Sequence, residues 1–254
     1  MCPAWAWLTC LPQSRSSASS GDLRIRHGDR EDMKRPVVMF VTGGVMLRGS
    51  GQSSEDVVRD VVSLAFAWAK AGVDIVQVRE AWLSDRGLLE LVRMTVDRLS
   101  SFATKVIVND RSDIALSANA DGIHLKDDPL PIERVRPYWP SDWLVGRSVH
   151  DVNGVNEIGG GGSVDYLLAG TVKSTPSKPG RTPLGFHGLK QIAAASDTPV
   201  IGIGGLEFRD SLDVAKTAAS GIAGVGLFMN GVKLTDDERA RQVEQCRYVF
   251  DSHK

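Results

Sequence analysis

Cysteine and aromatic residues are both scarce in this chain of 254 residues. The three cysteines, Cys2, Cys10 and Cys246, lack metal-ligand spacing, so they predict free thiols in a reducing cytoplasm rather than a zinc site or a disulfide framework. Aromatic residues make up 6% of the chain and hydrophobic residues 42%, which favours aliphatic packing in an α/β core. We therefore expect a cytoplasmic α/β protein.

The sequence also lacks a long apolar run and an excess of charge. No run approaches the ~20 apolar residues that a membrane-spanning helix needs. The 30 basic and 31 acidic residues give a net charge of −1, which gives no reason to expect binding to nucleic acid or to an acidic membrane. The partner we expect is instead a small molecule.

The first 32 residues differ in composition from the rest. Ser14–Gly21 is rich in serine, and Asp22–Asp32 is almost entirely charged or polar. A secretion signal is the alternative for Met1–Pro12, but that segment has neither a basic start nor a convincing apolar centre. We expect residues 1–32 to be a disordered tail, or sequence upstream of a true initiator at Met33, and residues 33–254 to form one domain.

From Pro36 onward, short apolar runs alternate with helical patterns. Continuous runs of Val, Ile and Leu are typical of parallel strands buried on both faces. The expected strands are Val37–Thr42, Asp74–Arg79, Lys105–Asn109, Gly122–Leu125, Leu144–Ser148, Tyr166–Gly170, Val200–Gly202 and Gly221–Gly226. The expected helices are Ser54–Ala71, Leu88–Phe102, Asp113–Ala120, Ile132–Trp139, Val152–Ile158, Phe186–Ala195, Asp210–Ala219 and Asp236–Phe250.

Eight strands alternating with eight helices predict a single (β/α)8 TIM barrel. A doubly wound open sheet is the alternative, but no Gly-x-Gly-x-x-Gly motif opens the first unit. In a barrel the carboxyl ends of all strands open onto one pocket, so polar residues at those ends are the candidate site.

Two neighbouring strand ends carry groups suited to anions and metals. Gln77 and Arg79 alternate along one strand and therefore point the same way, and a guanidinium can bind two phosphate oxygens at once. Asn109 and Asp110 end the next strand, where a carboxylate beside an amide can hold Mg²⁺. The alternatives are that Arg79 pairs with a nearby carboxylate and that Asp110 caps the following helix.

Two histidines lie near strand ends. His150 follows Ser148, and an imidazole there can accept or donate a proton near neutral pH. A structural role is the alternative for His150. For His124, inside an apolar strand, core and functional roles both stay open.

Loops at the later strand ends suit an anion. The loop Thr175–Lys178, with Thr175, Ser177 and Lys178, offers hydroxyls and an ammonium. Gly204 and Gly205 after the seventh strand, and Gly224 and Gly226 at the eighth, suit phosphate binding through backbone N–H groups. Turn geometry alone is the alternative for the glycines, and an ordinary solvated loop for Thr175–Lys178.

Taken together, these segments resemble the thiamine phosphate synthase/TenI family. VQVRE is similar to the family's Q-x-R-E-K, IVNDRSDIALSANADGIHL to its N-D-R to A-D-G-x-H-L stretch, STPSK to its P-T-x-T-K loop and PVIGIGG to its P-V-x-A-I-G-G. The resemblance runs from about Val37 to Phe228. It implies a (β/α)8 barrel that handles a thiazole phosphate in thiamine biosynthesis.

The synthase branch of the family joins that thiazole to a pyrimidine diphosphate. For a synthase, the resemblance implies Mg²⁺ at Asp110, pocket positions at Ser148, Thr175 and Ser177, and the thiazole phosphate at Gly205 and the turn after the eighth strand. It also implies that the diphosphate is held by Gln77, Arg79, Asn109 and Lys178.

Three departures favour the other branch, the TenI-like thiazole tautomerases. Ala81 replaces the lysine of R-E-K, Pro129 falls where a second metal-binding aspartate is expected, and GRSVH is similar to the TenI branch. Asp127 or Asp128, one or two residues out of register, can substitute for that aspartate. The resemblance implies that a tautomerase uses His150 as its acid and base, without a cofactor.

We therefore expect a thiazole tautomerase, with a Mg²⁺-dependent synthase as the alternative. A non-catalytic binder of thiazole or thiamine phosphate is a further alternative, and another phosphate-binding barrel stays open. The sequence also leaves open whether the chain forms a homo-oligomer.

Overall fold

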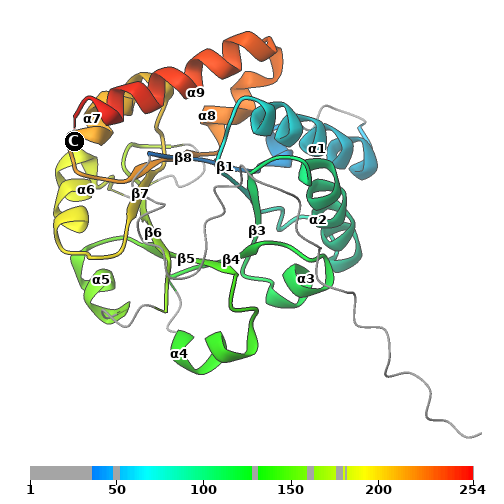
Figure 1. Cartoon of the computed structure of the whole chain (residues 1–254), viewed down its shortest axis with the longest axis horizontal. Helices are drawn as coiled ribbons and strands as arrows, with labels where there is room; N and C mark the ends of the chain where they lie inside the picture. Colours follow the sequence, from blue (N-terminus) through cyan, green and yellow to red (C-terminus); the bar gives the residue numbers. More distant parts are fainter. Residues whose placement is uncertain are drawn as a thin grey trace, which may run out of the picture.

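The computed structural model describes residues 36–47, 52–127, 131–158, 163–175, 180 and 182–253. Eight parallel strands form a closed barrel, in which each strand pairs with the next and β8 pairs with β1 (Figure 1). The strands are β1 (Val37–Val41), β2 (Ile75–Val78), β3 (Lys105–Asn109), β4 (Gly122–Leu125), β5 (Leu144–Val149), β6 (Tyr166–Gly170), β7 (Val200–Ile203) and β8 (Gly221–Gly224). The predicted TIM barrel is confirmed, and the open sheet is excluded because β8 closes onto β1.

Helices surround the barrel at the expected places. They are α1 (Ser54–Lys70), α2 (Asp85–Leu99), α3 (Ser112–Ser117), α4 (Ile132–Val135), α5 (Val152–Ile158), α6 (Gly185–Ala194), α7 (Ser211–Ala215), α8 (Gly226–Met229) and α9 (Asp236–Asp251). The described residues also form short 3-10 turns at η2 (Gly44–Met46), η3 (Arg136–Tyr138), η4 (Phe208–Asp210) and η5 (Asn230–Lys233).

Several predicted strand bounds are shifted by one residue, and the predicted end of the eighth strand is wrong by two. Strand β8 ends at Gly224, and Gly226 instead opens the short helix α8. Helix α1 begins at Ser54 as predicted, and Ser53 is its N-cap and makes a capping box with Asp56. Pattern alone places helix ends only to within a few residues.

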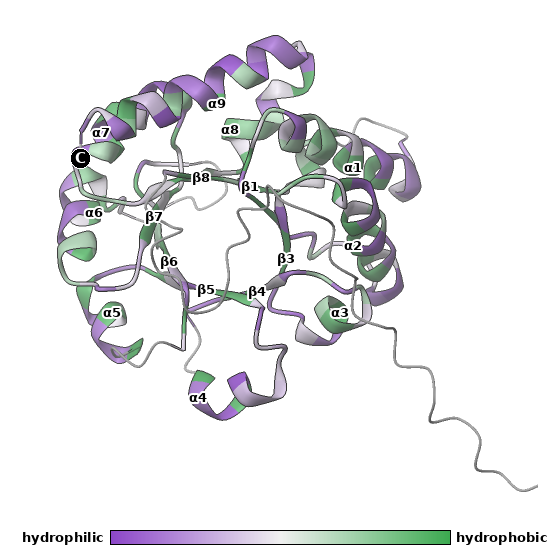
Figure 2. Cartoon of the chain, in the orientation of Figure 1, coloured by the Kyte–Doolittle hydropathy of each residue, from purple (hydrophilic) through white to green (hydrophobic). Residues whose placement is uncertain are grey.

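Alternation along the strands divides the core in two. One set of side chains fills the barrel interior: Val37, Met39, Val41, Ile75, Ile107, Leu144, Tyr166, Leu168, Ile201 and Ala223. The opposite faces pack against the helices, which show hydrophobic and hydrophilic residues along their length (Figure 2). A filled interior leaves the carboxyl ends of the strands as the place for a site.

Tyr166 fills the interior only because β5 has a glycine beside it. Gly146 pairs with Tyr166 in the register of β5 and β6. A Cβ on Gly146 would lie 2.0 Å from Cζ of that ring, well inside contact distance. The tyrosine hydroxyl then reaches Nδ1 of His124 at 2.9 Å, so the core packing here also supports the polar residues above it.

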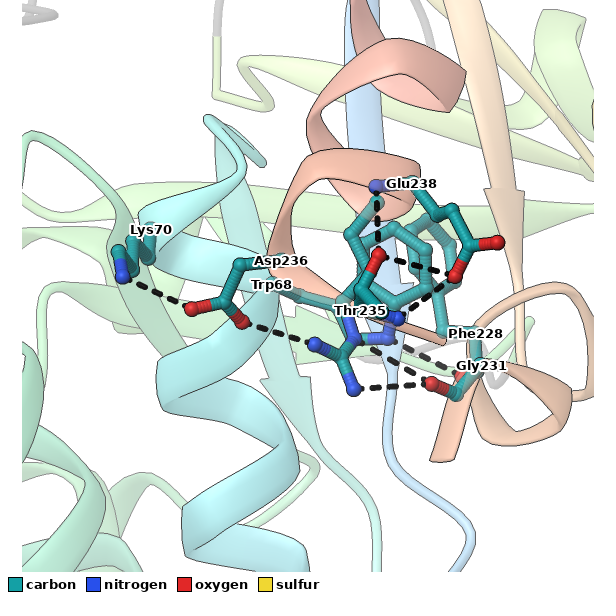
Figure 3. A network of polar contacts seen from close by, with 8 residues as sticks. Trp68, Lys70, Phe228, Gly231, Thr235, Asp236 and Glu238 are labelled. Atoms are coloured by element: carbon teal, nitrogen blue, oxygen red, sulfur yellow. Dashed lines mark hydrogen bonds and ion pairs between the residues drawn. The ribbon is translucent and has the colours of Figure 1, made fainter. Parts of the chain in front are cut away.

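Polar contacts hold the last elements of the barrel against α1 (Figure 3). The indole N–H of Trp68 donates to the carbonyl of Phe228 at 3.1 Å, at the end of α8. The buried Arg239 guanidinium donates to the carbonyl of Gly231 at 3.1 and 3.2 Å and to Asp236 at 2.9 Å. These contacts tie α8, η5 and the start of α9 together.

Among the described residues, no helix is both long and apolar enough to cross a bilayer. The predicted tail, residues 1–32, lies outside the described residues, so the assignment of the barrel domain to residues 33–254 stays a prediction at its N-terminal boundary.

Candidate active site

A chain of amide contacts links the ends of β2 and β3. Gln77 is buried in the barrel, and its Nε2 donates to Oδ1 of Asn109 at 2.8 Å. Asn109 in turn donates through Nδ2 to Oδ2 of Asp110 at 2.9 Å. Each amide nitrogen carries a second N–H, so the pair can also donate to the oxygens of an anion. The structure therefore brings Gln77, Asn109 and Asp110 together, as the sequence predicts.

Arg79 lies just beyond the end of β2 and is exposed. Its backbone N–H donates to the buried hydroxyl of Thr42 at 3.0 Å, which fixes the end of β2 against that of β1. Within the described part of the chain, no carboxylate forms an ion pair with its guanidinium. The alternative of a structural ion pair at Arg79 therefore has no support among those residues.

The neighbouring Glu80 has a structural role. Its buried carboxylate accepts the Gly44 N–H at 2.8 and 3.0 Å and the indole N–H of Trp82 at 2.6 Å. These bonds anchor the loop after β1 as the 3-10 turn η2.

Asp110 does not cap the following helix. Arg111 occupies the N-cap position of α3, and no side chain caps that end. Oδ1 of Asp110 instead accepts the backbone N–H of Lys126 at 3.0 Å, and Oδ2 lies 2.5 Å from the Lys126 ammonium. Asp110 also adopts a left-handed φ of 59°, which short polar residues tolerate better than most. Both of its oxygens face the end of β4.

His124 lies at the centre of a buried polar group. Its Nδ1 is 2.9 Å from the hydroxyl of Tyr166 and its Nε2 is 3.0 Å from Oγ of Ser148. Burial, reinforced by the positive charge of Arg79 and opposed by Asp110, lowers the pKa of His124 to about 3. The imidazole is therefore neutral at physiological pH, and it holds the Ser148 hydroxyl in place at the end of β5.

His150 follows β5 and is half-buried. Its Nδ1 contacts the carbonyl oxygen of Gly170 at the end of β6, and its Nε2 lies 3.2 Å from the carboxylate of Asp127. A neutral imidazole has one N–H, so it can donate to only one of these two acceptors at a time. Asp127 is thus a neighbour of His150, a contact that the sequence analysis did not predict.

The turn after β7 packs tightly on the loop after β6. Gly204 and Gly205 have positive φ values of 102° and 65°, and a Cβ on Gly205 would lie 2.6 Å from the carbonyl oxygen of Ser174. Lys173 donates its backbone N–H to Gly204 at 2.9 Å, and its ammonium bonds Asp210 at 3.0 and 3.1 Å. This turn requires glycine for geometric reasons, and phosphate binding there stays a prediction.

The structure describes only some of the remaining predicted site residues. Thr175 lies half-buried on the loop after β6, whereas Ser177 and Lys178 lie outside the described residues. Gly224 ends β8 against the side chain of Leu227, while no atom lies within 4 Å of the place where a Cβ on Gly226 would sit. Apart from its chain neighbours and its own helix, nothing crowds the backbone of Gly226 at the start of α8, and phosphate binding there stays a prediction.

Comparison with known proteins identifies the family. The family model for thiamine monophosphate synthase matches residues 51–228. The chain belongs to this family. A thiamine-phosphate synthase of Natronomonas pharaonis is 33% identical over 73% of this chain and 84% of the relative. One of Caldanaerobacter subterraneus is 31% identical over 70% of this chain and 83% of the relative.

A solved structure shows the same fold. The thiamine phosphate pyrophosphorylase of Pyrococcus furiosus superimposes with a TM-score of 0.68 at 23% identity, over 87% of this chain and 98% of that one. The resemblance drawn from the sequence is therefore confirmed for the family and the barrel. The branch is a finer question, and the names of the relatives favour the synthase over the tautomerase that we expected.

Magnesium fits the described residues poorly in this member of the family. The ion prefers near-octahedral coordination by oxygen, but Asp110 already has the Lys126 ammonium at 2.5 Å. Asp127 faces His150, and Asp128 and Pro129 lie outside the described residues. No group of three or more His, Cys, Asp or Glu residues in the described part of the chain could hold a metal. Mg²⁺ at Asp110 stays a prediction of the resemblance.

Sequence reasoning missed two members of this cluster, Lys126 and Tyr166. The position of Lys126 could have been predicted, because residues 122, 124 and 126 point to the same side if the extended chain of β4 continues for one more residue. Nothing in the sequence indicated that the ammonium reaches a carboxylate from β3, or that Tyr166 reaches His124 across the interior.

Proposed function

We propose that this protein is a thiamine-phosphate synthase, which joins a pyrimidine diphosphate to a thiazole phosphate. The observation that carries the proposal is the sequence identity above 30%, over most of the chain, to relatives named thiamine-phosphate synthase. In this reaction the thiazole nitrogen forms a bond to the carbon that bears the diphosphate. The carbon–oxygen bond breaks, and the diphosphate leaves with its electron pair.

The ends of β2 and β3 would hold the leaving diphosphate. The second N–H groups of Gln77 and Asn109 would donate to its oxygens, and Arg79 would bind it through its guanidinium. Gln77 Oε1 is buried without a hydrogen-bond partner among the described residues. This oxygen is an acceptor, so the partner it lacks is a donor group and not the diphosphate, which would bond to the amide N–H groups.

The opposite side of the barrel mouth would hold the thiazole phosphate. The glycine turn after β7 and the backbone at Gly226 would take its phosphate, and the Ser148 hydroxyl, fixed by His124, would contact the rings. Both reacting groups would then meet above the barrel axis. Holding two reactants in the reacting geometry is the main contribution that such a site makes to the rate.

The test is a condensation assay on the purified chain with both substrates, followed by chromatography for thiamine phosphate. Arg79→Met should lower kcat/KM by about 10- to 100-fold, the usual effect of removing a charged hydrogen-bond donor. Arg241→Met, on the exposed face of α9, is the matched control and should leave the rate unchanged. No thiamine phosphate from the wild type under any condition would overturn the synthase proposal.

A thiazole tautomerase is the second candidate, and the contact between His150 and Asp127 favours it. An imidazole 3.2 Å from a carboxylate is a pair suited to moving one proton. If the chain aromatises the carboxythiazole phosphate tautomer instead, His150→Ala should slow turnover by at least ~10²-fold with little change in affinity. Turnover that survives His150→Ala would exclude this role, and failure of both assays would favour the non-catalytic binder.

A further inference from the structure

Lys126 and Asp110 make a two-point contact at the ends of β3 and β4. The Lys126 backbone N–H donates to Oδ1 of Asp110 at 3.0 Å, and the ammonium lies 2.5 Å from Oδ2. The backbone hydrogen bond holds the main chain of Lys126 close to Asp110. The Lys126 side chain therefore has only a short distance to span to reach the carboxylate. Oδ2 of the Asp110 carboxylate also accepts the amide N–H of Asn109 at 2.9 Å. With the Lys126 ammonium on the same oxygen, little room is left there for another cation.

The barrel register places this ammonium on the side of the site. Asn109 pairs with His124, and the Asp110 N–H donates to the His124 carbonyl at 2.8 Å. Alternate residues of an extended chain point the same way. The side chain of Lys126, two residues after His124, therefore points to the same side as the His124 ring, toward the barrel axis. Lys126 therefore projects at the mouth, where the amides of Gln77 and Asn109 lie.

Charges of both signs lie at this end of the barrel among the described residues, with the cations Arg79 and Lys126 near the carboxylates of Glu80, Asp110 and Asp127. Arg79 follows β2, whose Gln77 bonds Asn109, and Asn109 bonds Asp110, so Arg79 and Asp110 lie at neighbouring strand ends. The imidazole is neutral, and the Asp127 carboxylate faces His150. An ammonium has three N–H donors. With one directed at Asp110 and a side chain that is 64% exposed, Lys126 retains donors for a ligand in the mouth.

We propose that the Lys126 ammonium, held by Asp110, is a built-in cation that binds the diphosphate of the substrate and of the product. The ammonium stays protonated throughout and donates hydrogen bonds to the diphosphate oxygens as the carbon–oxygen bond breaks. It supplies at Asp110 the positive charge that a divalent cation would otherwise supply there. The inference rests on the proposed synthase function for the identity of the diphosphate.

The experiment is calorimetric titration of the whole chain with inorganic diphosphate in excess chelator. Wild type should bind, and Lys126→Met should bind about 10- to 100-fold more weakly, because a charged hydrogen bond is lost. Lys126→Arg keeps the charge and should retain most of the affinity. Lys190→Met, an exposed lysine on α6, is the matched control and should bind as wild type does.

Two results would overturn the inference. One is equal affinity of wild type and Lys126→Met in chelator, and the other is wild-type binding that appears only when Mg²⁺ is added. Circular dichroism of each variant checks that a loss of affinity is not a loss of fold. Titration with Mg²⁺ alone gives a second readout, since Lys126→Met should bind the ion more tightly than wild type does.

Failure of the inference and failure of the synthase proposal give different results. If thiamine phosphate forms in the condensation assay but Lys126→Met binds diphosphate normally, the synthase proposal stands and the role of Lys126 is wrong. If diphosphate binding depends on Lys126 but no thiamine phosphate forms, the cation site stands and the synthase proposal is wrong.

Discussion

His124 is buried in the barrel, and this burial lowers the pKa of its imidazole. In water an imidazole of pKa 6.5 is partly charged near neutral pH, but burial lowers the pKa of His124 to about 3. Its two ring nitrogens contact the hydroxyls of Tyr166 and Ser148, both of which can donate or accept. A neutral ring satisfies both contacts, so His124 acts through the position of Ser148 rather than through its own charge.

This pKa has a consequence for stability. A histidine whose pKa is lowered by folding is neutral in the native state, so its contribution is present above the unfolded pKa of 6.5 and is lost as pH falls toward 3. Between pH 7 and pH 5 we expect the free energy of unfolding of wild type to fall by about 2 kcal/mol more than that of His124→Gln. Urea unfolding at the two pH values measures the difference. Parallel losses in the two proteins would show that His124 is not the group that titrates.

At the residue scale, the sequence could predict the side on which a residue faces but not its partner. Period-two alternation predicts that Gln77 and Arg79 point together, and the Gln77 to Asn109 bond requires only that β2 and β3 be neighbours. The contact of Asp127 with His150 joins two loops and has no periodic signal. Side chains at loop positions depend on the path of each loop, which local pattern does not fix.

At the element scale, β5 and β6 pack together because residue 146 of β5 is a glycine, which leaves space for the Tyr166 ring of β6. Gly146→Ala would place a methyl group 2.0 Å from the Tyr166 ring, in an interior with no room to yield. We expect a loss of about 1–3 kcal/mol in the free energy of unfolding, measured by chemical denaturation. Gly226→Ala is the control, because its Cβ would meet no atom within 4 Å. An equal loss in both variants would contradict the packing argument.

The junction of α8, η5 and α9 depends on one buried guanidinium. Arg239 is 7% exposed and bonds the carbonyl of Gly231 and the carboxylate of Asp236 (Figure 3). Arg239→Met should lower the free energy of unfolding by about 1–3 kcal/mol, because the carbonyl of the buried Gly231 loses its donor. Arg241→Met, exposed on the same helix, should change it by less than about 0.5 kcal/mol. Thermal unfolding of the two variants compares them directly, and equal midpoints would refute the role of Arg239.

At the scale of the whole molecule, β8 closes onto β1, so the described barrel is complete from residue 36 onward. A chain that begins at Met33 should therefore unfold with a midpoint within about 2 °C of the full chain, since no strand or helix of the barrel is removed. Differential scanning calorimetry of both chains is the measurement. A much lower midpoint would mean that residues before Met33 belong to the folded domain.

The barrel and the family could both be predicted before the structure was known. Each strand is a short aliphatic run and each helix has its own apolar period, so local pattern sufficed to count eight units, and the ordered motifs identified the family. Local pattern also placed the polar residues at the strand ends, because a parallel barrel puts all those ends on one face.

Which of those polar residues come into contact depends on the folded barrel and could not be predicted from local pattern. Closure of the sheet set the register that brings Asp110 to Lys126, and the packing of β5 on β6 put Tyr166 beneath His124. These contacts join residues from different strands, and their geometry depends on strand stagger and on loop paths. Such long-range geometry is fixed by the packing of the whole barrel, which the properties of a single segment do not contain.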